Sequence, residues 1–364
     1  MYYKYVVVGA GLAGLTMAER IANELNEKVL LIEKRGHIGG NVFDSYNEDG
    51  ILIHNYGPHI FHTNDKGVYD YLSKFTAWND FWHRVLTYVD GNLIPMPITV
   101  ETINKLYNLN LSCEEVEEFL KHKAIAMDEI KTSRDVALSK VGEDIYQKFF
   151  ENYTKKQWGI DPAEIDTSVI SRIPIRYNRD TRYFNDKYQG MPKYGYTKMC
   201  EKMIENKNIK VLLNTDYKEV IDDITYDALI YTGPTDEFYD YKYGKLSYRS
   251  IDFVFETFDK EKYQEAPVVN YPNDYDFTRI TEFKQLTWQE HKKTTILKEF
   301  PCKEGEPYYP FPTKECKAQF ALYQKEMDKE SKVYFLGRLA QYRYYNMDAV
   351  VAESLRMFEE IRRK

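Results

Sequence analysis

The 364-residue sequence is poor in cysteine and contains no long apolar run. Its four cysteines, Cys113, Cys200, Cys302 and Cys316, are scattered without a Cys-x-x-Cys pair. This spacing argues against a structural zinc site and against a disulfide framework, so we expect no metal centre. No stretch of about 18 apolar residues occurs, so we expect no membrane insertion. The N-terminus enters a strand pattern at once instead of a signal-peptide layout, which favours a cytoplasmic location.

Positive charge is also in deficit, because 50 Lys and Arg residues face 57 Asp and Glu residues, for a net charge of −7. Binding to nucleic acid through a global basic field is therefore not expected, although a local positive pocket is compatible with this balance. Aromatic residues are abundant instead, with 33 Tyr and 19 Phe. Tyr combines an apolar ring with a hydroxyl group, which suits a cleft that holds flat rings and phosphates. A compositional bias of the genome is the alternative explanation of the total.

The N-terminal segment reads as strand, glycine turn, helix and strand, with the strands at residues 4–8 and 29–33. The turn contains the G-x-G-x-x-G spacing, formed by Gly9, Gly11 and Gly14. In this motif the first glycine permits a tight turn, the second lets the backbone approach a pyrophosphate, and the third lets helix and strand pack closely. The N–H groups at the start of the helix would bind phosphate. Glu33 ends the second strand and would accept hydrogen bonds from a ribose, so the segment predicts a dinucleotide site.

The segment after Glu33 favours FAD over NAD as the cofactor. Residues 33–41 resemble the E-x-R-x-x-x-G-G segment of FAD proteins of the glutathione-reductase and amine-oxidase type. Gly337 and Arg338 follow a strand and precede a helix, as the second FAD contact does in that class. A helix that begins near Met347 would direct its N-terminus at the flavin and stabilise negative charge on it. The further cofactor residues predicted from this segment are Lys34, Gly39, Gly40 and Asn41.

The rest of the chain predicts both helices and antiparallel strands. Residues 99–150 are rich in Glu, Lys and Leu and nearly free of Gly and Pro, which indicates several helices in one insertion. Residues 85–94 alternate like a hairpin strand around the turn signal Asp90-Gly91. Further helices are expected at 65–75 and 347–362, and further strands at 210–213, 228–231, 248–258, 294–300 and 332–335.

Five segments together resemble the UDP-galactopyranose mutase family, in order from the first strand to the last helix. They are YGPHIFHTN (56–64), YTKKQWG (153–159), RIPIR (172–176), YFNDKYQG (183–190) and GRLAQYRYY (337–345). The resemblance implies an α/β fold with a discontinuous Rossmann-like FAD-binding domain at 1–80, 190–235 and 330–364. It further implies an inserted helical bundle at 99–150, and a substrate domain with a six-stranded antiparallel sheet at 81–98, 151–189 and 236–329. A mobile lid near 165–185 and a homodimer are also implied.

The reaction implied by the resemblance is the interconversion of UDP-galactopyranose and UDP-galactofuranose. In this family reduced FAD attacks the anomeric carbon through its N5 atom, UDP leaves and returns, and the sugar ring opens and recloses with no net redox change. The product would supply furanose for cell-surface polysaccharide. The expected partner is therefore a nucleotide sugar, UDP-galactose first of all.

The resemblance also assigns site residues, because a departing UDP carries about two negative charges that arginines and phenols must hold. Arg176 and Arg279 match the pyrophosphate-binding arginines, and His59 and His62 match the flavin-facing loop, where a neutral imidazole would tune N5. These four are the predicted catalytic residues. Predicted phosphate contacts are Tyr183, Tyr188, Tyr309 and Tyr344; predicted uridine contacts are Phe149, Phe150, Tyr153, Thr154 and Trp158. Further substrate candidates are Arg172, Asn270, Arg338 and Asn346, and further flavin candidates are Arg249 and His83. Helix core is the alternative for Phe149 and Phe150.

Two positions depart from the family pattern and keep other functions open. Asn346 stands where an acidic residue is usual, and Pro58 stands where Ala is common. A mutase for a dTDP-6-deoxyhexose or for UDP-N-acetylgalactosamine is therefore an alternative. A redox flavoenzyme of the amine-oxidase type would share the FAD motif but would need no arginine–tyrosine pocket, and turnover without an electron acceptor separates the two. A non-catalytic flavoprotein would show no affinity for nucleotide sugars.

Overall fold

The computed structural model describes residues 1–363, so the predicted domain end at Lys364 lies outside the described residues. Its first sheet has five parallel strands in the order β10-β2-β1-β11-β17. Their bounds are β10 Ile209–Leu212, β2 Val29–Ile32, β1 Tyr2–Val8, β11 Thr225–Tyr231 and β17 Val333–Phe335. All were expected from short apolar runs, as is usual for strands of a parallel sheet that are covered on both faces. The α/β fold class and the N-terminal Rossmann-like unit are thus confirmed.

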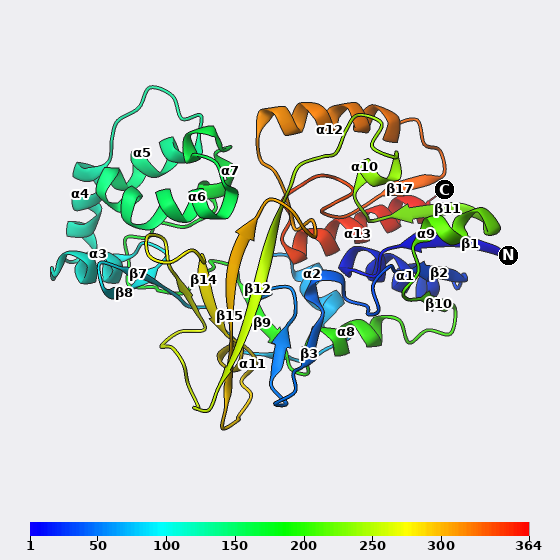
Figure 1. Ribbon diagram of the computed structural model, residues 1–364, viewed down its shortest axis with the longest axis horizontal. Helices are drawn as coiled ribbons and strands as arrows, with labels where there is room; N and C mark the ends of the chain where they lie inside the picture. The colour runs from blue at the N-terminus through cyan, green and yellow to red at the C-terminus, as the bar shows by residue number, and fades with distance from the viewer. Residues whose placement is uncertain (364) are drawn as a thin grey trace.

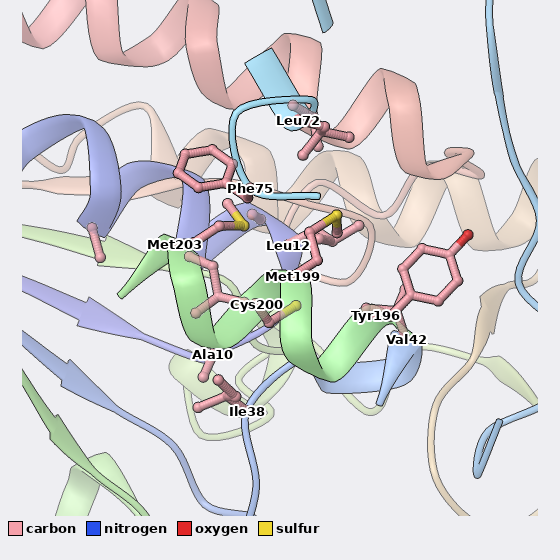
Figure 2. Packing of buried hydrophobic residues seen from close by; sticks show 14 of the residues in the cluster. Ala10, Leu12, Ile38, Val42, Leu72, Phe75, Tyr196, Met199, Cys200 and Met203 are labelled. Atoms are coloured by element: carbon pink, nitrogen blue, oxygen red, sulfur yellow. The ribbon is translucent and has the colours of Figure 1, made fainter. Parts of the chain in front are cut away.

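Helices cover both faces of the parallel sheet. One face packs on α1 (Leu12–Glu24), α8 (Tyr196–Met203) and α13 (Met347–Arg362), and the other on residues from α9 (Tyr217–Val220) and α10 (Thr235–Phe238). Figure 2 shows how α8 presents Met199, Cys200 and Met203 to this core, beside Leu12 of α1. Cys200 is a free and fully buried thiol that packs here as a small apolar side chain.

The second sheet lies in the middle of the molecule, between the parallel sheet and a helical part (Figure 1). It has seven strands in the order β16-β12-β15-β14-β13-β7-β8. Their bounds are β16 Tyr309–Pro310, β12 Tyr248–Phe258, β15 Thr294–Cys302, β14 Arg279–Glu282, β13 Val268–Asn270, β7 Val85–Val89 and β8 Asn92–Met96. The expected six antiparallel strands are therefore corrected in two ways. The short β16 adds a seventh strand, and β13 runs parallel to β7. These two strands lie far apart in the sequence, so no hairpin turn between them requires the antiparallel direction.

The helical part contains α3 (Val100–Tyr107), α4 (Cys113–Lys123), α5 (Ser133–Ile145), the π-helical turn η2 (Tyr146–Glu151), α6 (Asn152–Trp158), η3 (Pro162–Glu164) and α7 (Ser168–Ser171). Thr99, Ser112 and Thr132 cap the first three helices, and each forms a reciprocal capping box with the third residue of its helix. Helical structure continues past residue 150, because η2 runs directly into α6. This continuity carries the chain from the helical core to the wall of the cavity described below.

The remaining elements join these parts. They are η1 (Gly40–Val42), β3 (Asp44–Tyr46), β4 (Leu52–His54), β5 (Phe61–Thr63), α2 (Lys66–Leu72), β6 (Trp78–Asn79), β9 (Tyr188–Pro192), η4 (Ile221–Asp223), α11 (Phe283–Thr287) and α12 (Lys314–Met327). Strands β5, β9 and β6 form a small antiparallel sheet, and β3 pairs with β4. Helix α12 was not predicted, because it lies on the surface and buries only Tyr323 among its residues, which leaves little apolar periodicity to detect.

Candidate active site

A first cavity of about 380 Å³ opens where β1 and β2 end and α1 begins. Of the cofactor residues predicted above, this cavity is lined by Gly9, Gly11, Glu33, Lys34, Gly39, Gly40, Asn41, His59, Gly337, Arg338 and Met347. Helix α1 starts at Leu12 after its N-cap Gly11, and no described side chain caps its free N–H groups, nor is there an acidic residue in its first turn. These N–H groups are therefore available to an anionic group such as a pyrophosphate.

The glycines of the turn differ in what surrounds them. A Cβ atom on Gly14 would lie 1.9 Å from the carbonyl oxygen of Gly9, so this position needs glycine for helix–strand packing. Gly14 accordingly lies beneath the cavity and does not line it. A Cβ atom on Gly11 would meet only the Cα of Gly40 at 3.9 Å, so Gly11 leaves free space on the cavity side.

Glu33 is a buried carboxylate at the end of β2. Its Oε2 accepts a hydrogen bond of 2.7 Å from the N–H of Ala10, and its Oε1 accepts one of 2.8 Å from the N–H of Arg35. Each oxygen keeps a second lone pair, so the carboxylate is fixed in place and still able to accept from a hydroxyl group.

A second cavity of about 450 Å³ adjoins the first, and both are lined by His59, Arg338 and Met347. It lies between the helical part and the seven-stranded sheet. Most predicted substrate residues line it, namely Phe149, Phe150, Tyr153, Thr154, Trp158, Arg172, Tyr183, Asn270, Arg279, Tyr309, Arg338, Tyr344 and Asn346. His62 and His83 line this second cavity and not the first, although both were predicted near the flavin.

Arg279 is held in the second cavity by an ion pair inside the sheet. Its Nε lies 2.7 Å from Oε1 of Glu299, which stands directly opposite on β15 and is fully buried. Desolvation works against the charge of Arg279, but the Glu299 carboxylate raises the pKa of Arg279 well above its usual value. Arg279 is therefore a fixed positive charge, and Glu299, which lines neither cavity, is a positioning residue that the sequence did not reveal.

Two further arginines lie over the phenol rings of the cavity. The guanidinium carbon of Arg172 lies 4.6 Å from the ring centre of Tyr344. That of Arg338 lies 5.1 Å from the ring of Tyr309 and 5.8 Å from that of Tyr344. Desolvation alone would raise the pKa of Tyr344, but Arg172 and then Arg338 outweigh it and lower this pKa below its usual value. The field in this part of the cavity therefore favours negative charge.

An aromatic wall adjoins these phenols. Trp158 contacts Tyr309 and Tyr344, with ring centres 6.3 Å and 6.2 Å apart. Phe149 and Phe150 lie on the π-helical turn, belong to the core of the helical part and also line the cavity. Helix core and substrate site were alternatives for Phe149 and Phe150, and in the structure the two residues belong to the core and line the cavity. Flat apolar walls of this kind suit a nucleobase.

Besides Gly14, three predicted residues lie outside both cavities, which corrects their assignment as direct contacts. Arg176 donates to Asn185 Oδ1 at 2.9 Å and to the carbonyl oxygens of Asp180 (2.8 Å) and Arg182, so it fastens the loop that carries Tyr183. Tyr188 points away on β9 and stacks on Tyr69 at 4.6 Å. Arg249 donates to the carbonyl oxygens of Gln157 (2.7 Å), Lys156 (2.9 Å) and Pro301 (3.2 Å), and thereby ties α6 to the sheet.

The predicted histidines differ in their surroundings. His59 Nδ1 lies 2.9 Å from the carbonyl oxygen of Gly57, and desolvation followed by the nearby His54 lowers the pKa of His59 to about 3. Burial likewise lowers the pKa of His83 to about 3, and its Nδ1 has no partner in the part of the chain that the structure describes. His62 is different, because its Nδ1 lies 2.8 Å from Oδ2 of Asp186. Because their pKa values are lowered to about 3, His59 and His83 are neutral at neutral pH.

His54 supports the loop that carries His59, and this predicts acid sensitivity. Its Nδ1 accepts the backbone N–H of His59 at 3.1 Å, and burial lowers the pKa of His54 to about 4. An unfolded histidine binds a proton near pH 6.5, so the stabilisation is present above that pH and is lost as the pH falls toward about 4. We expect the free energy of unfolding to fall by about 2 kcal/mol through His54 between about pH 7 and pH 5.

Urea unfolding at these two pH values checks this expectation. His54→Gln should flatten the pH dependence by about that amount, while His122→Gln, at an exposed position of α4, should leave it unchanged. Equal pH dependence in wild type and His54→Gln would contradict the assignment.

Within residues 1–363, no helix is long and apolar enough to cross a membrane. The same residues contain no group of three or more His, Cys, Asp or Glu side chains that could hold a metal ion.

A parallel sheet with a glycine turn, open to a cavity that joins a cationic and phenol-lined one, defines an enzyme with a Rossmann-type dinucleotide-binding domain. A model of the NAD(P)-binding Rossmann-like domain matches residues 7–75, and a model described as UDP-galactopyranose mutase matches residues 148–344. The chain belongs to the UDP-galactopyranose mutase family and is an isomerase of this type.

Relatives and a solved structure agree with this membership. The chain is 37% identical over 363 residues to the probable UDP-galactopyranose mutase of Klebsiella pneumoniae, covering 98% of this chain and 94% of that protein. It is also 37% identical over 364 residues to the dTDP-fucopyranose mutase of Escherichia coli, covering 97% and 96%. A crystal structure of reduced UDP-galactopyranose mutase matches its fold with a TM-score of 0.80 at 17% identity, covering 99% of this chain and 94% of that one.

Proposed function

We propose that this isomerase interconverts UDP-galactopyranose and UDP-galactofuranose with reduced FAD bound in the first cavity. The observation that carries the proposal is the junction of the two cavities at His59, Arg338 and Met347. A dinucleotide bound at the glycine turn and a nucleotide sugar bound between the arginines would meet at this junction.

The residues of the first cavity fit FAD by their own chemistry. The uncapped N–H groups after Gly11 suit a pyrophosphate, and the fixed Glu33 carboxylate suits a ribose hydroxyl. Helix α13 begins at Met347, and its N-cap Asn346 forms no side-chain cap, so its N–H groups favour negative charge, which Asp348 in the first turn partly supplies. Reduced flavin would supply the nucleophile that attacks the anomeric carbon.

The residues of the second cavity fit a nucleotide sugar. Arg172, Arg279 and Arg338 would bind the diphosphate and stabilise its charge as the bond to the sugar breaks. The hydroxyls of Tyr183, Tyr309 and Tyr344 would donate hydrogen bonds to the same group. Tyr153, Thr154 and Trp158 would enclose the uracil.

A second substrate deserves a parallel assay, because the dTDP-fucopyranose mutase relative is as similar to this chain as the probable UDP-galactopyranose mutase is. Asn346 lines the second cavity and stands where the family pattern has an acidic residue. The cavity therefore lacks a negative charge that the family pattern has at this position. A dTDP-linked 6-deoxyhexose is therefore the alternative substrate.

The test is to reduce the purified, flavin-loaded protein with dithionite and to add UDP-galactofuranose or dTDP-fucofuranose in separate reactions. We expect UDP-galactopyranose to appear by chromatography, without consumption of an electron acceptor. Conversion of the dTDP sugar alone would move the assignment to the alternative. Failure with both sugars would contradict the proposed function.

A further inference from the structure

A carboxylate–imidazole pair lines the second cavity beside the arginine–tyrosine cluster. His62 lies on β5, and Asp186 lies in the loop that leads into β9. Nδ1 of His62 is 2.8 Å from Oδ2 of Asp186, and both residues line the cavity. Strands β5 and β9 pair antiparallel with His62 opposite Gln189, so the sheet itself brings the two side chains together.

Several contacts hold this pair in one geometry. The second oxygen of Asp186, Oδ1, accepts from Nδ2 of Asn64 at 2.8 Å. The side-chain amide of Gln189 donates to the main-chain carbonyl oxygen of Asp186 at 2.9 Å. The Phe184 ring stacks on His62 with ring centres 3.6 Å apart and planes 12° apart. Arg176 fastens the same loop through Asn185. Carboxylate and imidazole are thus both fixed.

The pair sets which nitrogen of His62 is free. A carboxylate accepts a hydrogen bond, so Nδ1 of His62 carries a proton and donates to Asp186. Nε2 has no hydrogen-bond partner among the described residues, and the His62 side chain is 14% exposed in the wall of the cavity. Nε2 is therefore open to a ligand, and the hydrogen bond from Nδ1 to the carboxylate fixes the orientation of the ring.

The isomerisation needs a group of this kind. In a pyranose the anomeric carbon is bonded to O5 and O4 carries a proton; in a furanose the anomeric carbon is bonded to O4 and O5 carries the proton. One proton must therefore leave O4 and one must arrive on O5 in each turnover. The two oxygens lie on adjacent carbons, so a single nitrogen can serve both.

We infer that His62 moves this proton and that Asp186 is its positioning residue. His62 enters the step with a proton on each ring nitrogen, the one on Nε2 taken up from solvent. Nε2 gives this proton to O5 as the bond between C1 and O5 breaks, and takes the proton of O4 as the bond between C1 and O4 forms. The imidazole ends in the state in which it began, and no oxidant or reductant is needed for these steps. The inference rests on the proposed function.

The other two histidines of the second cavity, His59 and His83, have no carboxylate partner among the described residues. Nδ1 of His59 faces the carbonyl oxygen of Gly57, and Nδ1 of His83 has no partner among residues 1–363. Their pKa values of about 3 keep them neutral near neutral pH, so they are poor proton carriers there. Of the three, His62 is the one with a carboxylate partner.

Asp186→Asn tests the pair, because it keeps the size of the side chain and removes its charge. We expect kcat for isomerisation to fall by about 10²–10³-fold, with KM, flavin content and thermal stability close to those of the wild type. Asp186→Glu should restore part of the rate, and His62→Gln combined with Asp186→Asn should cost little more than either change alone. Asp70→Asn makes the same chemical change on the exposed face of α2 and should leave kcat unchanged.

A second readout separates proton transfer from departure of UDP. In UDP-galactose with heavy oxygen between C1 and the β-phosphorus, the label scrambles each time UDP leaves and returns, whether or not the ring isomerises. Asp186→Asn should keep this scrambling within a few-fold of the wild type while isomerisation is lost. Wild-type isomerisation by Asp186→Asn, or an equal loss of scrambling, would overturn the inference. Absence of both reactions in the wild type would instead contradict the proposed function.

Discussion

Arg172→Ala is expected to lower kcat for sugar isomerisation by about 10²–10³-fold while the protein keeps its flavin. Arg172 lines the second cavity and lies over the Tyr344 ring at 4.6 Å, whose pKa it helps to lower. Without this guanidinium, the cavity loses one of its three arginines and so part of the positive charge that would stabilise the departing diphosphate. The effect corresponds to about 3–4 kcal/mol of transition-state stabilisation.

Arg179→Ala is the matched control, because Arg179 lies seven positions further along the same segment, is exposed, and pairs with Glu101 at the surface. It should leave kcat and flavin content unchanged. Arg176→Ala should act through the loop that Arg176 fastens, and so should lower thermal stability together with substrate affinity. Near-normal kcat in Arg172→Ala, with a large loss in a stable Arg176→Ala protein, would favour the original assignment from the sequence.

Gly14→Ala is expected to destabilise the apoprotein by about 2–3 kcal/mol and to abolish stable flavin binding. The added Cβ would lie 1.9 Å from the carbonyl oxygen of Gly9 and 3.1 Å from Cγ1 of Val7, so α1 must shift away from β1. Such a shift displaces the N–H groups of the helix that line the cofactor cavity. Urea unfolding of the apoprotein and the flavin absorbance of the purified chain measure the two effects.

Gly11→Ala is the informative partner variant. Gly11 has φ −76° and ψ 179°, which alanine adopts freely, and its Cβ would meet no closer atom than the Cα of Gly40 at 3.9 Å. The urea concentration at the midpoint of unfolding of the apoprotein should therefore equal that of the wild type. Flavin affinity should fall by about 10–100-fold, which is about 1.4–2.8 kcal/mol of binding free energy. Unchanged flavin affinity in Gly11→Ala would mean that the pyrophosphate does not bind at this turn.

The sequence predicted those parts of the fold that local signals determine. The glycine turn between β1 and α1, the hairpin at Asp90-Gly91 and the closing helix α13 all depend on short patterns within one segment, and each is confirmed. The parallel pairing of β13 with β7 could not be predicted in this way, because the two strands are far apart in the sequence and no turn fixes their direction.

The two arginines of the RIPIR segment show which site assignments the sequence alone could not make. Arg172 and Arg176 are the same residue type four positions apart, and both fit a pyrophosphate-binding role. Their difference comes from the backbone: Ile175 bridges to Ile98, and the N–H of Arg176 donates to the carbonyl oxygen of Ile98 at 2.9 Å. This contact fixes Arg176 beside its own loop. Glu299 and Asp186 were missed for a similar reason, because their partners Arg279 and His62 become neighbours only in the folded sheets.

The first cavity is assembled from chain segments that are made early and late in synthesis, since residues 8–42 form one wall and residues 337–350 another. A nascent chain that has reached the middle of the sequence holds the glycine turn but lacks the wall containing Gly337 and Met347. Tight binding of the proposed FAD must therefore wait until residues 337–350 have been made and have packed beside residues 8–42.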